Sequence, residues 1–162
     1  MKAPDGVIDI FLQPGDYYFG DESTRIRTIL GSCVSITLWH PWKRIGGMCH
    51  FMLPQRAQRG DEFHGKYADE VLELLLKQVR LHKTHPGDYQ IKLFGGGDMF
   101  PGRPSRGESI SRRNIQAARQ FLDQYNMKPI SENVGASGHR NVIFEVWSGN
   151  VWVRHQPIRE VN

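Results

Sequence analysis

The stretch most informative about the fold is Arg25–Pro54, which reads RIRTILGSCVSITLWHPWKRIGGMCHFMLP. Within Val34–Trp39 apolar and polar side chains alternate, and this period of two predicts a half-buried strand. The strand is expected to end at His40-Pro41, because proline cannot donate a hydrogen bond to a sheet ladder. Gly46–Leu53 predicts a further strand that stops at the next proline. The stretch therefore predicts two neighbouring strands with a glycine-containing turn before the first.

Outside this stretch the pattern predicts short strands and two helices. Strands are expected at Val7–Leu12, Tyr17–Phe19, Arg25–Leu30, Tyr89–Phe94 and Pro129–Asn133, and a hairpin at Asn141–Trp147 and Val151–Arg154. One amphipathic helix begins at Ala68, with an apolar stripe over Val71–Val79 and with Glu70, Glu73, Lys77 and Arg80 on the other face. The second spans about Ser111–Tyr125 and is expected to bury Ile115, Ala118, Phe121 and Leu122. Gln55–Gly65 shows no periodicity and is expected to be a loop.

Strands and helices do not alternate regularly along the chain. This order favours an α+β fold, a layered α/β sandwich of mixed and antiparallel sheets with two main helices, over a doubly wound parallel sheet. A length of 162 residues is typical of one domain with a core of its own, so a single domain is expected over residues 1–162.

Composition excludes several classes of protein. Hydrophobic residues make up 39% of the chain and charged residues 23%, which argues against wholesale disorder. No apolar run approaches the roughly 20 residues that a bilayer span needs. Pro4, Asp5 and Gly6 interrupt the N-terminus before any apolar segment, so a secretion signal is not expected. We expect a cytoplasmic protein without direct membrane insertion.

The formal net charge is +4, and four arginines lie close together in the sequence: Arg103, Arg106, Arg112 and Arg113. Such a basic surface attracts an acidic partner, either nucleic acid or an acidic protein surface. The sequence has no paired Cys/His spacing, no aromatic RNA-binding run and no basic heptad helix. Nucleic acid is therefore not the partner we expect.

Cys33 and His50 are the first candidates for chemistry. A thiol attacks only as thiolate, and a neighbouring histidine can take its proton and return it to a leaving group. Gly31-Ser32 lets the backbone turn tightly before the cysteine, so that amide N–H groups can hold the oxyanion of an acyl-transfer intermediate. The alternative is that Cys33 is a small core residue and His50 a hydrogen-bonded strand histidine. Spacing alone leaves both interpretations open.

The remaining candidates are weaker. Cys49 is adjacent to His50, so in a strand the two side chains point to opposite faces, and Cys49 is interpreted as a core thiol. Free thiols are expected rather than a disulfide between the two cysteines, as is usual in cytosolic proteins. No spacing of histidines and cysteines indicates a metal site. Gly95-Gly96-Gly97 lacks the lysine of a phosphate loop and is interpreted as a turn that lets the backbone pass close to the site.

Several motifs follow one another along the chain: Thr28–Val34, Gly46–Pro54, Gly65–Asp69, Phe94–Phe100, Arg113-Asn114-Ile115 and the closing hairpin Asn141–Val153. Together they resemble the motifs of the CheD family of chemoreceptor glutamine deamidases. The resemblance covers nearly the whole chain in order. It implies hydrolysis of selected glutamine side chains to glutamate on the cytoplasmic helices of methyl-accepting chemotaxis proteins. It also implies a sandwich fold whose active site resembles that of the cytotoxic necrotizing factor toxins.

Carried over residue by residue, the resemblance implies Cys33 as nucleophile, His50 as base and Thr28 as the residue that orients the histidine. The backbone around Gly31 and Ser32 would hold the oxyanion, and no cofactor is needed. Because receptor methylation helices are acidic, the four clustered arginines are expected to help dock them.

Three rival functions stay open. Family members resemble binding partners of the CheC phosphatase, so a non-catalytic adaptor that binds receptors or a CheC-type phosphatase is one of them. Another cysteine acyl-transfer enzyme, such as a transglutaminase or protease, is the second, and nucleic-acid binding is the third. The presence of all three of Thr28, Cys33 and His50 favours catalysis over the adaptor.

Overall fold

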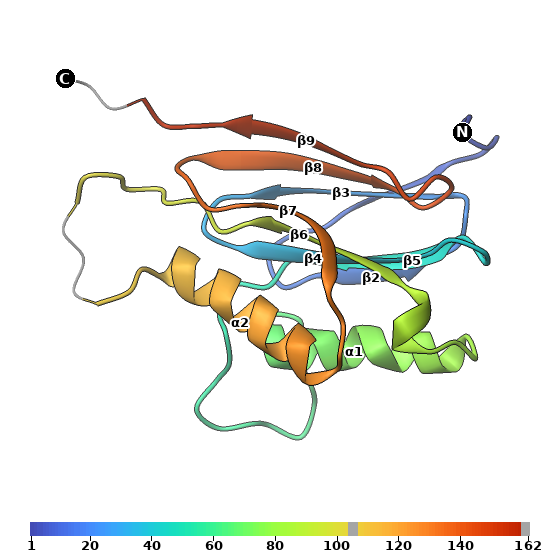
Figure 1. The fold of residues 1–162 in the computed structure, drawn as a ribbon, viewed down its shortest axis with the longest axis horizontal. Helices are drawn as coiled ribbons and strands as arrows, with labels where there is room; N and C mark the ends of the chain where they lie inside the picture. Colours follow the sequence, from blue (N-terminus) through green and yellow to red (C-terminus); the bar gives the residue numbers. More distant parts are fainter. Residues whose placement is uncertain (104–106, 160–162) are drawn as a thin grey trace.

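Two sheets stacked face to face form two of the three layers of the fold (Figure 1). The structure is a computed structural model in which residues 1–103 and 107–159 are described. The outer sheet has the order β1-β3-β8-β9, with bounds β1 Ile8–Phe11, β3 Thr24–Leu30, β8 His139–Glu145 and β9 Val151–Gln156. The central sheet has the order β2-β5-β4-β6-β7, with bounds β2 Tyr17–Gly20, β5 Ile45–Cys49, β4 Val34–His40, β6 Gln90–Gly95 and β7 Pro129–Val134. Both sheets are mixed, because β1 pairs parallel with β3 and β6 parallel with β7, while the other neighbours are antiparallel.

The third layer consists of α1 (Ala68–Leu81) and α2 (Ile110–Gln124), which cover the face of the central sheet that points away from the outer sheet (Figure 1). A short 3-10 turn at Pro86–Asp88 connects α1 to β6. The helix N-terminus of α2 is capped by the side chain of Ser109, which accepts a hydrogen bond from the amide of Arg112. The expected α+β class, a layered sandwich with mixed sheets and two main helices, is confirmed.

The three layers enclose two hydrophobic cores. The helix-side core lies between the helices and the central sheet and includes Val34, Ile36, Leu72, Leu75 and Leu122. The inter-sheet core lies between the two sheets and includes Ile26, Leu30, Met48, Phe94 and Phe144. The central sheet is therefore apolar on both of its faces.

This arrangement corrects one expectation about β4, which was predicted to be half-buried. Every residue of β4 except Trp39 is buried, because helices cover one face of the central sheet and the outer sheet covers the other. The alternation of the sequence therefore separates two cores instead of core and solvent. Thr37, on the side that was expected to be polar, is only 2% exposed.

A second correction concerns Glu70, which was assigned to the exposed face of α1. Its side chain is fully buried and forms a two-pronged ion pair with Arg56, with two nitrogen–oxygen distances of 2.8 Å. The same carboxylate accepts a hydrogen bond from the amide of His64. The pair thereby attaches the predicted loop Gln55–Gly65, which contains neither helix nor strand, to the first turn of α1.

Among the residues that the structure describes, no helix has the length and hydropathy required to cross a membrane.

Candidate active site

His50 lies one residue beyond the end of β5 and not within the strand as predicted. Its backbone is held by the turn after β1: the amide of His50 donates to the carbonyl of Asp16, and its carbonyl accepts from the amide of Gly15. The residue is only 2% exposed. Two hydrogen bonds to a neighbouring segment therefore fix the backbone of His50, in place of a regular strand ladder.

Thr28 determines which nitrogen of that imidazole carries the proton. It lies in β3 with its side chain buried on the face toward the central sheet, and its Oγ1 is 2.7 Å from His50 Nδ1. The hydroxyl has one proton, which it donates to the carbonyl of Leu12 at 2.9 Å. Oγ1 must then accept from Nδ1–H, so the neutral imidazole keeps an unprotonated Nε2. This nitrogen is free to act as a base.

Cys33 and His50 project from the same face of the central sheet. Val34 and Phe51 form an antiparallel bridge with hydrogen bonds of 3.2 and 3.1 Å, in the same register as the β4–β5 ladder. In this register Cys33 lies opposite Met52, so the two side chains are on the same face of the sheet. Met52 and His50 are two residues apart, so His50 shares that face. Consistently, Cys33 packs against the inter-sheet core, where the side chain of Thr28 also points.

Burial shapes the electrostatics of this group. Desolvation raises the pKa of the Cys33 thiol, although the adjacent Ser32 hydroxyl lowers it in part. Burial also lowers the pKa of His50 to about 4, and the negative charge of Asp16 raises it in part. At neutral pH the resting site therefore contains a neutral thiol and a neutral imidazole. This is the state in which a base can take the proton as the sulfur attacks.

The turn before the cysteine uses all of its carbonyl groups. The carbonyls of Gly31, Ser32 and Cys33 accept from Gly97 N at 2.9 Å, Asn114 Nδ2 at 3.2 Å and Gly96 N at 2.8 Å, respectively. By contrast, no acceptor in residues 1–103 and 107–159 contacts the amide N–H of Ser32 or Cys33. Donors without an acceptor beside a nucleophile are the groups that can bind a developing oxyanion.

The triple glycine runs close to Cys33, the candidate nucleophile, as predicted. Gly95 and Gly96 have φ angles of 104° and 66°, which favour glycine, and a Cβ on Gly95 would lie 2.3 Å from the carbonyl oxygen of Cys33. The buried guanidinium of Arg140 stabilises this loop by donating hydrogen bonds to the carbonyls of Gly95 and Gly135. The loop therefore acts as a backbone support for the turn.

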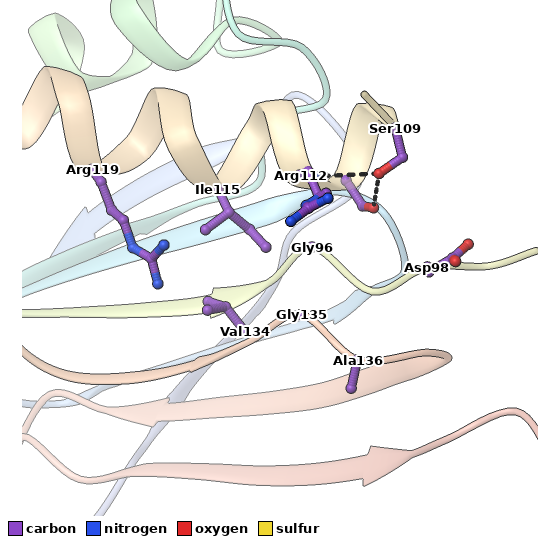
Figure 2. Close-up of a pocket in the computed structure, with 10 residues that line it drawn as sticks. Gly96, Asp98, Ser109, Arg112, Ile115, Arg119, Val134, Gly135 and Ala136 are labelled. Carbon is purple, nitrogen blue, oxygen red and sulfur yellow. Dashed lines mark hydrogen bonds between the residues drawn. The ribbon is translucent and has the colours of Figure 1, made fainter. Parts of the chain in front are cut away.

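The three described arginines of the cluster line different surface features. Arg112 lines a pocket between α2 and the ends of β6 and β7, where Figure 2 shows it pointing from the helix toward Gly96. Arg113 lines a different hollow beside Glu108 and Gln116, and Arg103 stacks over the exposed ring of Phe100. Arg106 lies outside the described residues. The pocket in Figure 2 is lined by none of Thr28, Cys33 and His50.

Cys49 is the buried thiol that the sequence indicated. It is 0% exposed in the helix-side core, and burial raises its pKa to about 12. Both cysteines are free thiols and they pack against different cores. Across the described ranges no three His, Cys, Asp or Glu side chains converge as metal ligands would.

Two residues near the site were missed by the sequence analysis. Asp16 was assigned only to a turn, and nothing in the sequence connects it to His50. Asn114 was noticed only as part of a motif. Its position could have indicated a role, because it lies four residues before Ala118, on the apolar stripe of α2. A polar residue on a buried stripe indicates a specific hydrogen-bonding role.

Comparison with known proteins shows the family of the chain. The family described as CheD chemotactic sensory transduction matches residues 52–155. The chain belongs to the CheD family. A CheD protein of Pseudomonas savastanoi pv. phaseolicola, named a probable chemoreceptor glutamine deamidase, is 48% identical over 99% of this chain and 92% of its own length. A likewise named CheD protein of Pseudomonas syringae pv. syringae is 49% identical over 98% of this chain and 90% of its own length.

More distant CheD relatives also match most of the chain. A probable chemoreceptor glutamine deamidase of Leptospira interrogans is 40% identical over 94% of this chain and 96% of its own length. The likeness to these CheD proteins therefore includes the segment with Thr28, Cys33 and His50. This segment lies just before the residues that the family model matches.

Proposed function

We propose that this CheD-family protein is a glutamine deamidase that converts selected glutamine side chains of methyl-accepting chemotaxis proteins to glutamate. The observation that carries the proposal is the Thr28–His50 hydrogen bond of 2.7 Å, in which the threonine hydroxyl is already committed as a donor elsewhere. This arrangement leaves a buried histidine with an unprotonated Nε2, on the face from which Cys33 projects. A core thiol and a hydrogen-bonded strand histidine would not require it.

In the proposed mechanism His50 Nε2 takes the proton of the Cys33 thiol as the sulfur attacks the δ-carbon of the glutamine side chain. The carbonyl oxygen becomes an oxyanion, which the free amides of Ser32 and Cys33 stabilise; one such donor contributes about 10²–10³ in rate. His50 then gives its proton to the departing nitrogen, and ammonia leaves a thioester. Water loses a proton to His50 and hydrolyses the thioester, which yields glutamate and restores the thiol. The balance is one water consumed and one ammonia released.

The pKa directions favour the second proton transfer, from His50 to the leaving nitrogen, and oppose the first, from the Cys33 thiol to His50. Because burial holds the pKa of His50 well below neutrality, its protonated form is a strong acid that readily protonates the leaving amine. Because burial raises the pKa of Cys33, the thiol does not ionise before substrate binds. No cofactor enters any step.

For the docking surface we propose Arg103, Arg112 and Arg113, together with Arg106. Neither Arg112 nor Arg113 has a carboxylate within ion-pair distance in the described part of the chain. Arg103 and Phe100 belong to the same loop as Met99, whose Sδ would lie 3.1 Å from a Cβ added at Gly31 in the turn before Cys33. An acidic receptor helix that meets these cations would bring its glutamine to the site, in the cytoplasm where such helices lie.

The docking proposal is tested by charge neutralisation. The double variant Arg112→Gln/Arg113→Gln should bind a receptor cytoplasmic fragment more weakly and with a shallower salt dependence than wild type. The matched control is Arg25→Gln/Arg27→Gln, which removes the same charge from a pair that already bonds to Asp9 on the outer sheet. Unchanged binding and unchanged salt dependence in the first variant would refute this role for the arginines.

The deamidase proposal is tested by mass spectrometry of a receptor cytoplasmic fragment incubated with the purified protein. Site-specific conversion of glutamine to glutamate should occur with wild type and disappear with Cys33→Ala. Conversion that survives in Cys33→Ala would show that the nucleophile is wrong. Binding of several receptors or of a CheC-type phosphatase without any conversion would favour the adaptor function instead.

A further inference from the structure

Asn114 connects the two segments that hold the proposed nucleophile and base. It lies in the first half of α2 and is completely buried. Its Nδ2 donates to the carbonyl of Ser32 at 3.2 Å and to the carbonyl of Met52 at 2.9 Å. Ser32 directly precedes Cys33, and Met52 follows His50 by two residues. One side chain thus uses both of its amide hydrogens on the two catalytic segments.

The orientation of this side-chain amide follows from its neighbours. Both contacted atoms are carbonyl oxygens, which only accept hydrogen bonds, so the nitrogen must face them. The other end of the amide, Asn114 Oδ1, is buried and has no hydrogen-bond partner among the described residues. A buried acceptor without a partner costs free energy, and an apolar residue of similar size would avoid the cost. Packing alone therefore does not explain an asparagine at this position.

The bond to Ser32 has a direct consequence for the Cys33 amide. The Ser32 carbonyl and the Cys33 N–H belong to the same peptide group, and none of the described peptide bonds is cis. In a planar trans peptide the C=O and N–H point in opposite directions. By holding the carbonyl toward α2, Asn114 turns the Cys33 N–H away from the helix. This N–H is one of the two amides without an acceptor.

We propose that Asn114 is a positioning residue for acyl transfer, which fixes the Ser32–Cys33 peptide so that the Cys33 amide faces the oxyanion and ties this peptide to the His50 segment. The inference rests on the proposed thioester mechanism and deepens it. Asn114 does not touch the substrate. Its contribution appears when negative charge develops on the substrate oxygen, and not when substrate binds or when the thiol ionises.

The test compares Asn114→Asp and Asn114→Ala with wild type. Aspartate keeps the shape but replaces both donor hydrogens with an acceptor, and alanine removes the group. Both variants should lower kcat by about tenfold to a hundredfold, the size of effect expected when a catalytic donor is misplaced. KM for the receptor fragment and the rate of Cys33 alkylation by iodoacetamide should stay near wild type, because neither depends on an oxyanion.

The matched control is Leu122→Ala, which weakens the packing of the same helix at its other end without contacting the turn. It should lower the melting temperature with little change in kcat. If the Asn114 variants kept wild-type kcat, the inference would be wrong. It would also be wrong if kcat, alkylation rate and melting temperature fell together in the Asn114 and Leu122 variants alike.

A second substrate separates this inference from the proposed function. p-Nitrophenyl acetate acylates a reactive cysteine through an oxyanion but needs no receptor. If wild type reacts with the ester but converts no receptor glutamine, the deamidase proposal fails, and the Asn114 variants are judged on the acylation rate. If wild type reacts with neither, both proposals fail.

Discussion

Replacing Thr28 with valine removes one hydroxyl at nearly constant shape and tests the tautomer argument. Valine cannot accept from His50 Nδ1–H, so that buried N–H loses its partner at 2.7 Å. Stranding a buried polar group costs about 1–3 kcal/mol. The imidazole can avoid this cost by moving its proton to Nε2, but then the base site is occupied. Restoring the active tautomer costs the same free energy, so kcat/KM should fall by about 5- to 150-fold, at 1.36 kcal/mol for each factor of ten.

The assay is the rate of glutamine conversion in a receptor fragment, with Thr28→Ser as the matched control. Serine keeps the hydroxyl that donates to Leu12 and accepts from His50, so it should retain most of the activity. Nitrogen-15 NMR of the imidazole should show the proton on Nδ1 in wild type and on Nε2 in Thr28→Val. Wild-type activity in Thr28→Val, or equal losses in the serine and valine variants, would refute the reasoning.

Three further predictions concern charge and burial. Burial lowers the pKa of His50 to about 4, so the base stays neutral as the pH falls from 7 to 5. The value of kcat/KM should therefore be lost only as the pH falls through about 4. A loss centred near 6.5 would contradict this prediction. Iodoacetamide should modify Cys33 in the native protein and Cys49 only after unfolding, as peptide mass mapping would show; native labelling of Cys49 would contradict its burial. Arg56→Met should lower the free energy of unfolding in urea by about 3–5 kcal/mol, because it leaves the buried Glu70 carboxylate without its cation, whereas exposed Arg59→Met should change it little.

The layers, helices and strands could be predicted because the hydrophobic pattern of each element lies within a short run of contiguous residues. The stripe on α1 and the hairpin of β8 and β9 are recorded in contiguous residues, and the structure confirms both. The burial of β4 on both faces could not be predicted in the same way. Serine and threonine on its second face are typical of solvent contact, and only the stacking of a distant sheet makes that face an interior.

In the candidate site, too, the features within one short stretch could be predicted, whereas contacts between distant stretches could not. Cys33 after Gly31-Ser32 is visible as a chemical pattern, and the histidine nearby suggests a base. The contact between Thr28 and His50 cannot be derived from spacing, because the two residues belong to different layers. The resemblance named Thr28, and the hydrogen-bond geometry supplies the physical reason for it. Glu70 was assigned to the wrong face because its partner Arg56 lies in a segment without periodicity.

The hydrogen bond between Thr28 and His50 also connects the proposed active site to the order of folding. Thr28 belongs to the outer sheet through its pairing with Val142, which comes from the far end of the chain, whereas His50 follows a strand of the central sheet. Pairing between residues so distant in sequence forms slowly. A refolding chain should therefore regain its helices and the β4–β5 hairpin while it is still inactive. Enzymatic activity would return only when the two sheets pack against each other. The time course of recovered activity would therefore report the rate of the last step of folding.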